Sequence, residues 1–109
     1  MTAEIKLGDN SVILCGNAAT AVRYKQVFRN DLLMAFKGMT AEDFDTDVVK
    51  QLAFIMMKQS ENADFKQITF DDFISWLEQF EETDILEAAA EIIGCWLQNT
   101  KTLTKAKKK

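Results

Sequence analysis

The segment spanning residues 47–59 constrains the fold more than any other part of the chain. At 100° per residue its apolar side chains cover an arc of about 200° around a helix. They are Val48, Val49, Leu52, Ala53, Ile55, Met56 and Met57. Asp45 or Thr46 can cap the start of this helix. The arc is too wide for an ordinary surface helix.

The residues before Gly16 predict a β-hairpin. Polar and apolar side chains alternate over residues 4–7, and residues 12–15 form an apolar run rich in β-branched side chains. Between them, residues 8–11 carry a dense turn signal. The pattern therefore favours two short antiparallel strands at the N-terminus.

Two helices are expected between the hairpin and residue 39. Asn17 can cap the first of them. Its apolar residues at helical spacing are Ala21, Tyr24, Val27 and Phe28. Asn30 tolerates the left-handed conformation that would interrupt this helix, and Asn30 or Asp31 can cap the apolar run 32–36. This short second helix should end at Gly38.

Two further helices are expected after residue 68. Thr69 offers a cap with a carboxylate, Asp72, at the third helical position. The apolar stripe of this helix comprises Phe70, Phe73, Ile74, Leu77 and Phe80. Asp84 and Glu87 form a second candidate cap pair. Because charges are scarce over residues 85–97, that last helix should lie centrally in the core.

Together these elements predict a mainly α (α+β) fold, with an N-terminal β-hairpin followed by about five helices in a compact bundle. We expect residues 1–99 to form a single domain and residues 100–109 a flexible lysine-rich tail. Residues 1–99 hold eight basic and all 17 acidic residues, a net charge of −9, and the tail carries +5. Nucleic-acid binding by so acidic a body is not expected.

Catalysis and metal binding are not expected either. The chain has no histidine, which removes the commonest general base and zinc ligand. Cys15 and Cys95 are too few for a structural zinc site, so we interpret them as buried thiols in a reducing cytoplasm. Residues 43–47 have the carboxylate spacing of a calcium loop, but Val48 and Phe54 replace its glycine and bidentate glutamate. We predict no catalytic residue, metal or cofactor.

Three aromatic residues fit a simple core poorly. Phe54 projects among polar side chains of its helix, Trp76 lies at the edge of its apolar stripe, and Trp96 belongs to a helix that is apolar almost all round. Surplus apolar surface is typical of a protein interface. Equally, a small core can wrap these helices on several sides. The candidate protein-contact residues are Phe54, Met57, Trp76, Phe80 and Trp96.

Several hydrophobic motifs occur along the chain in a fixed order: AVRYKQVF at 21–28, LAFIMM at 52–57 and FISWLEQF at 73–80, before a lysine-rich end. In this order the chain resembles the tail assembly chaperones of long-tailed, siphovirus-like bacteriophages and prophages. The residues that carry the resemblance include Tyr24, Phe28, Asp31, Leu32, Trp76 and Leu77. The family often has a glycine where this chain has Arg29 and Asn30.

The resemblance implies a non-catalytic protein of the bacterial host cytoplasm that binds the phage tape measure protein and helps to recruit tail tube subunits. It also implies absence from the mature virion. Repeated apolar contacts of modest affinity suit a long helical client. Self-association stays open, and no apolar stretch is long enough to predict membrane insertion. The codons of Lys107, Lys108 and Lys109 could contain a ribosomal slippage site, or the lysines could only aid solubility.

Two alternative functions stay open, a phage-encoded nucleic-acid-associated regulator and a minor structural protein of the virion. Arg23, Lys25 and Arg29 approach the basic face of a recognition helix. The solvated side of a helix would explain them as well. A basic stripe on the folded surface would favour the regulator, and co-purification with finished particles would favour the virion protein.

Overall fold

The computed structural model describes residues 2–39 and 42–108, with side chains described to residue 97. Its first elements are strands β1 (Thr2–Leu7) and β2 (Asn10–Cys15), which pair antiparallel with Leu7 opposite Asn10. Gly8 has a φ of +67° at the first position of the two-residue turn, as a type II′ turn requires. The predicted hairpin is confirmed, with a tighter turn than expected.

Within the described part of the chain, five helices follow the hairpin. They are α1 (Thr20–Phe28), α2 (Leu32–Phe36), α3 (Thr46–Ser60), α4 (Phe70–Leu77) and α5 (Glu82–Lys108). The predicted fold class, a hairpin followed by helices in a compact bundle, is confirmed.

Short-range side-chain hydrogen bonds fix the starts of three helices where the sequence predicts them. The carboxylate of Asp31 accepts a hydrogen bond from the Met34 N–H at the start of α2, and Asp45 does the same for the first turn of α3. Thr69 and Asp72 form a complete capping box at α4. Each cap satisfies N–H groups that have no partner inside the helix.

Two predicted details around α1 are wrong. Ala19, not Asn17, is the N-cap residue, because the Asn17 side chain instead folds a turn by accepting the Ala19 N–H at 2.9 Å. At the other end, Arg29 takes the left-handed conformation, with a φ of 58°, where the sequence points to Asn30. The left-handed residue between α1 and α2 is therefore Arg29 and not Asn30.

The ends of α4 and α5 also differ from prediction. Helix α4 stops at Leu77, so Phe80 lies in the turn that follows it. Helix α5 begins at Glu82, and the Asp84 carboxylate accepts the Glu81 N–H from within its first turn. The backbone of α5 continues to Lys108, past the predicted tail boundary. The flexibility of the tail stays a prediction, and Lys109 lies outside the described residues.

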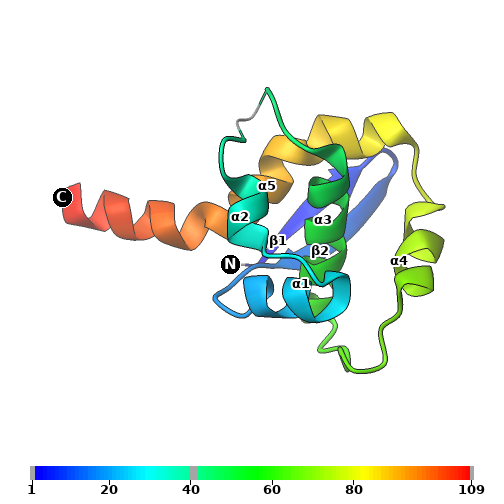
Figure 1. Cartoon of the computed structure of the whole chain (residues 1–109). Coiled ribbons are helices and arrows are strands. Elements are labelled where there is room, and N and C mark those ends of the chain that lie inside the picture. Colours follow the sequence, from blue (N-terminus) through cyan, green and yellow to red (C-terminus); the bar gives the residue numbers. More distant parts are fainter. Residues whose placement is uncertain (1, 40–41, 109) are drawn as a thin grey trace.

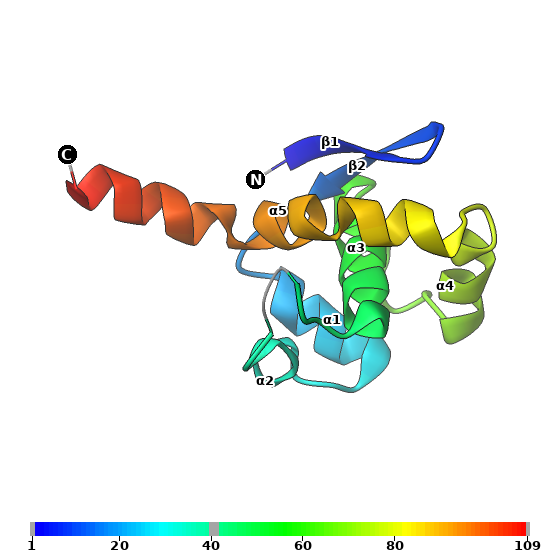
Figure 2. The same ribbon diagram turned by 90° about the horizontal axis from the view of Figure 1, so that it is seen from above.

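Helix α3 lies at the centre of the molecule. The hairpin and α5 cover one side of it, α1 and α2 lie on the opposite side, and α4 flanks it (Figures 1 and 2). Its buried residues are Val48, Val49, Leu52, Ala53, Phe54, Ile55, Met56 and Met57. A helix enclosed on so many sides needs apolar residues around most of its circumference, which explains the wide arc in its sequence.

The hairpin contributes one face to the same core. Ile5, Leu7 and Leu14 are buried on that face, and Val12 is half-buried beside them. The buried residues of the hairpin and of helices α2 to α5 belong to one hydrophobic cluster, which Tyr24 of α1 also joins. No helix in the described ranges is long and apolar enough to cross a lipid bilayer.

Candidate protein-binding surfaces

Phe54 lies in the core, which decides between the two alternatives that the sequence left open for this residue. Its side chain is fully buried, because α4 packs on the side of α3 that carries it. Its ring centroid lies 5.4 Å from that of Phe73 and 5.7 Å from that of Trp76. The Lys58 ammonium lies over the Phe54 ring, 5.6 Å from its centroid. For Phe54, the alternative in which the core wraps α3 on several sides holds.

The other candidate contact residues divide between two places. Met57 and Trp76 are buried, and the half-buried Phe80 packs on Trp76 with ring centroids 5.1 Å apart. Trp96 lies apart from them and is half-buried. Its ring packs on that of Phe36, with ring centroids 5.1 Å apart, and so connects α5 to α2. The structure therefore brings Phe54, Met57, Trp76 and Phe80 together and leaves Trp96 elsewhere. Contact between any of them and a partner stays a prediction.

The residues that carry the family resemblance mainly hold the fold together. Tyr24 is fully buried, and its hydroxyl donates a hydrogen bond to Gln51 on α3. Burial raises the pKa of the Tyr24 phenol, with a further contribution from nearby carboxylates. Phe28 is half-buried among aromatic rings and Asp31 caps α2. Leu32 is buried and Leu77 half-buried.

An exposed apolar surface lies instead on α1 and α2, at residues the sequence did not single out. Val22, Leu33 and Met34 are 67%, 66% and 63% exposed. We refer to these three residues as the α1–α2 patch. A groove of about 450 Å³ lies beside Val22 and Leu33. A short surface helix cannot bury every side chain of a run of five apolar residues. The run 32–36 was therefore the signal in the sequence from which this exposed surface could have been predicted.

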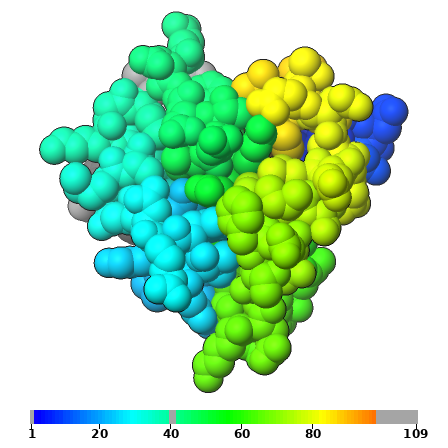
Figure 3. Space-filling model, turned by 45° about the vertical axis from the view of Figure 1, so that its right-hand side comes forward, coloured from blue at the N-terminus to red at the C-terminus, as the bar shows by residue number. Residues whose placement is uncertain are grey.

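Helix α4 adds two more exposed apolar side chains. Phe70 is 56% exposed and Ile74 is also exposed. The Phe70 ring lies 6.4 Å from that of Phe28 at the end of α1. Figure 3 shows α1, α2 and α4 on one face of the molecule. Exposed apolar side chains thus occur on three helices, α1, α2 and α4.

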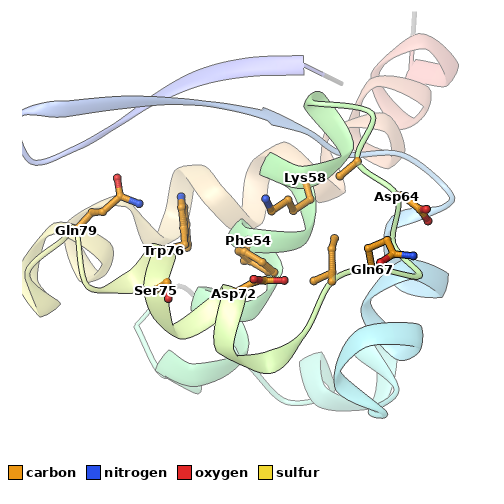
Figure 4. A pocket seen from close by; sticks show the side chains of 10 residues that line it. Phe54, Lys58, Asp64, Gln67, Asp72, Ser75, Trp76 and Gln79 are labelled. Atoms are coloured by element: carbon orange, nitrogen blue, oxygen red, sulfur yellow. The ribbon is translucent and has the colours of Figure 1, made fainter.

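A second surface is a hollow of about 480 Å³ next to α4 (Figure 4). Its floor includes Phe54 and Trp76, and Lys58 and Gln79 stand at its edge. The same Lys58, Trp76 and Gln79 also line a groove of about 530 Å³ that runs beside β2. The two depressions therefore meet at these side chains.

Cys15 and Cys95 are not joined by a disulfide bond. Cys95 is buried, as expected, and burial raises its thiol pKa, whereas Cys15 is only half-buried. In the described ranges, no three His, Cys, Asp or Glu side chains gather closely enough to hold a metal ion. The carboxylate of Asp45, from the acidic stretch 43–47, caps α3.

Comparisons of the chain with protein-family models, with curated proteins and with solved structures found no match.

Proposed function

We propose that this protein is a non-catalytic tail assembly chaperone of a long-tailed bacteriophage or prophage. It binds the tape measure protein, helps to recruit tail tube subunits in the host cytoplasm, and is absent from the mature virion. The order of hydrophobic motifs supports this assignment. The single structural observation that supports it most is the α1–α2 patch, with three large apolar side chains each more than 60% exposed.

The geometry of the α1–α2 patch suits a helical client. Val22 projects from α1, and Leu33 and Met34 project from α2. A helix bound in the groove beside them would place apolar residues from successive turns against both helices. Burying one such side chain contributes roughly 1.5–3 kcal/mol before the costs of association. Contacts of this size give modest affinity at each site, which allows later displacement by the tube.

The setting of Arg23 supports a protein client over nucleic acid. Its guanidinium lies 4.7 Å from the centre of the Phe65 ring and donates a hydrogen bond to Gln26. It is therefore engaged within the protein, and only Lys25 and Arg29 are left on α1 and its end for a phosphate backbone. The acidic body, with its net charge of −9, opposes such binding further.

Co-expression with the tape measure and tail tube proteins encoded nearby, followed by pull-down, tests the proposal. We expect both to be retained by the wild type, and the tape measure to be lost when Val22, Leu33 and Met34 are all changed to Ser. The matched control is Leu86→Ser, which removes an exposed apolar side chain from α5. Thermal melts should show that both variants stay folded.

Three results would contradict the proposal. Retention of neither protein by the wild type would refute the assigned partners. Equal retention by the triple variant and by Leu86→Ser would refute the α1–α2 patch as the binding surface. Co-purification of the protein with finished phage particles would favour the virion component over the chaperone.

A further inference from the structure

Strand β2 has a free edge. The sheet of the described chain contains only β1 and β2, so each strand has one unpaired side. Leu7 and Asn10 close the two-residue turn and therefore form a hydrogen-bonded pair. Such pairs alternate along an antiparallel ladder with pairs whose backbone groups point away. The N–H and C=O groups of Ser11 and Ile13 consequently point away from β1.

These outward backbone groups have no hydrogen-bond partner in the described ranges of the chain. Ser11 and Ile13 are both exposed, Ile13 to 46%. An exposed strand edge of this kind is a ready template for another extended segment.

The two edges of the hairpin differ in charge. The outward positions of β1 include Glu4 and Lys6, charged side chains of the kind that protects an edge strand from pairing. The corresponding positions of β2 are Ser11, Ile13 and Cys15, none of which is charged. Of the two edges, only that of β2 lacks this protection.

A groove of about 530 Å³ lies beside the unprotected edge. One wall is Ser11, Val12 and Ile13 of β2, and the opposite side includes Trp76 and Gln79, with Met57 also lining the groove. In Figure 4 the Trp76 and Gln79 side chains point towards the hairpin. β1 and β2 lie over α5 and α3, so a third strand beside β2 would lie over the end of α4.

We propose that the β2 edge binds an extended segment of a partner protein, added as a third strand, in which apolar and basic side chains alternate. Backbone hydrogen bonds to Ser11 and Ile13 would hold the segment. Its alternate side chains would face Met57 and Trp76. This inference concerns a surface separate from the α1–α2 patch and does not depend on it.

The walls of the groove favour a single strand over a second copy of this chain. The end of α4 stands opposite β2, so the groove is bounded on both sides. A second globular body could not bring its own strand to β2 without displacing Trp76 and Gln79. One extended peptide needs only the spacing of about 4.8 Å between neighbouring strands.

The charges around the groove favour basic residues on the partner. Glu61, Asp64 and Asp72 line it or the adjoining hollow, against the single ammonium of Lys58. Lys58 already pairs with Glu61 at 3.6 Å. The adjoining hollow then holds two carboxylates, Asp64 and Asp72, without a cationic partner in its lining, and the body as a whole, with its net charge of −9, attracts a basic partner.

The test is an NMR titration of the ¹⁵N-labelled full chain with a short peptide of alternating valine and lysine. We expect the amide signals of Ser11 and Ile13 and the indole signal of Trp76 to shift. A peptide N-methylated at every residue lacks the backbone donors whichever way the strand runs and should bind at least about tenfold more weakly. A peptide of alternating valine and glutamate should also bind more weakly.

Ile13→Pro is the matching change in the protein. Ile13 lies opposite Glu4 in a pair without ladder hydrogen bonds, so proline there removes only the outward N–H. We expect at least about a tenfold loss of affinity in Ile13→Pro. Ile13→Thr keeps the donor and should bind as the wild type does. If Ile13→Pro does not fold, the N-methylated peptide still tests the same hydrogen bonds.

Several outcomes would overturn the inference. They are the absence of any shift, shifts confined to the α1–α2 patch, and equal binding of the N-methylated peptide. Sedimentation showing that the free protein dimerises through β2, with dimerisation abolished in Ile13→Pro, would assign the edge to a second copy instead.

Discussion

A β-carbon built on Gly8 would lie 2.6 Å from a carboxylate oxygen of Asp84. The turn of the hairpin and the first turn of α5 therefore meet at a point that has room only for glycine. The other oxygen of the same carboxylate accepts the Glu81 N–H at 2.8 Å, so the side chain cannot easily move away.

We expect Gly8→Ala to lower the free energy of unfolding by about 2 kcal/mol or more, because it adds a clash to an unfavourable positive φ. Gly38→Ala is the matched control, since Gly38 also has a positive φ, of +83°, but has open space around it. It should lose only about 1 kcal/mol. Urea denaturation measures both, and equal losses would contradict the predicted contact with Asp84.

Gly16→Ala should also be destabilising, by about 2 kcal/mol or more. A β-carbon at Gly16 would lie 2.8 Å from the Cys95 carbonyl oxygen and 3.0 Å from the Trp96 Cα, both of which are backbone atoms. Gly94→Ala, in the same part of α5, meets nothing within 4 Å and should stabilise the protein by about 0.5–1 kcal/mol. Thermal melts that gave both changes the same sign would contradict this packing of β2 on α5.

Phe54→Ala should cost about 3–5 kcal/mol, because it leaves a cavity between α3 and α4. Phe70→Ala, at a ring that is 56% exposed, should cost about 1 kcal/mol or less. Chemical denaturation compares the two. A small loss for Phe54→Ala would show that Phe54 is not a core residue, and loss of partner binding in any Phe54 variant would have to be separated from unfolding.

Cys15 should react with iodoacetamide before Cys95 does. Cys95 is buried, and burial raises its thiol pKa, which lowers the thiolate fraction that reacts. Mass spectrometry should find one fast site in the folded protein, and none in Cys15→Ser. Both thiols should react in guanidinium. Rapid labelling of native Cys15→Ser would contradict the burial of Cys95.

The free energy of unfolding should fall as the pH rises above about 9. Burial raises the pKa of Cys95 above its ordinary 9.0, and burial followed by nearby carboxylates raises that of Tyr24 above 10.0. Both groups hold their protons more tightly in the folded protein, so the unfolded chain ionises first and gains stability. Denaturation curves over this range should depend less on pH in Tyr24→Phe. An unchanged dependence would contradict the prediction for Tyr24.

Local patterns in the sequence predicted the cap Thr69 and narrowed two others to Asn30 or Asp31 and to Asp45 or Thr46, because a cap depends on residues within one helical turn. The structure decided for Asp31 and Asp45. The prediction at Asn17 was wrong because its side chain accepts the Ala19 N–H and so forms the turn before α1 instead of capping the helix. At the α1–α2 break, the left-handed residue is Arg29, which the preference for asparagine does not predict.

The candidate contact residues were harder to predict. A helical projection shows Phe54 among polar neighbours on its own helix, but it contains no information about α4, whose Phe73 and Trp76 enclose it. The same limitation hid Val22, Leu33 and Met34, which are apolar but more than 60% exposed.

The sequence by itself determined the hairpin, the order of the helices and the need to surround α3, because strand alternation, caps and apolar arcs are set by near neighbours. Only the tertiary structure decided which apolar side chains remain exposed and which strand edge faces a groove. Exposure depends on elements distant in the chain, such as α4 over Phe54 and the open side of β2 opposite Trp76. Residue spacing within one segment does not encode that packing.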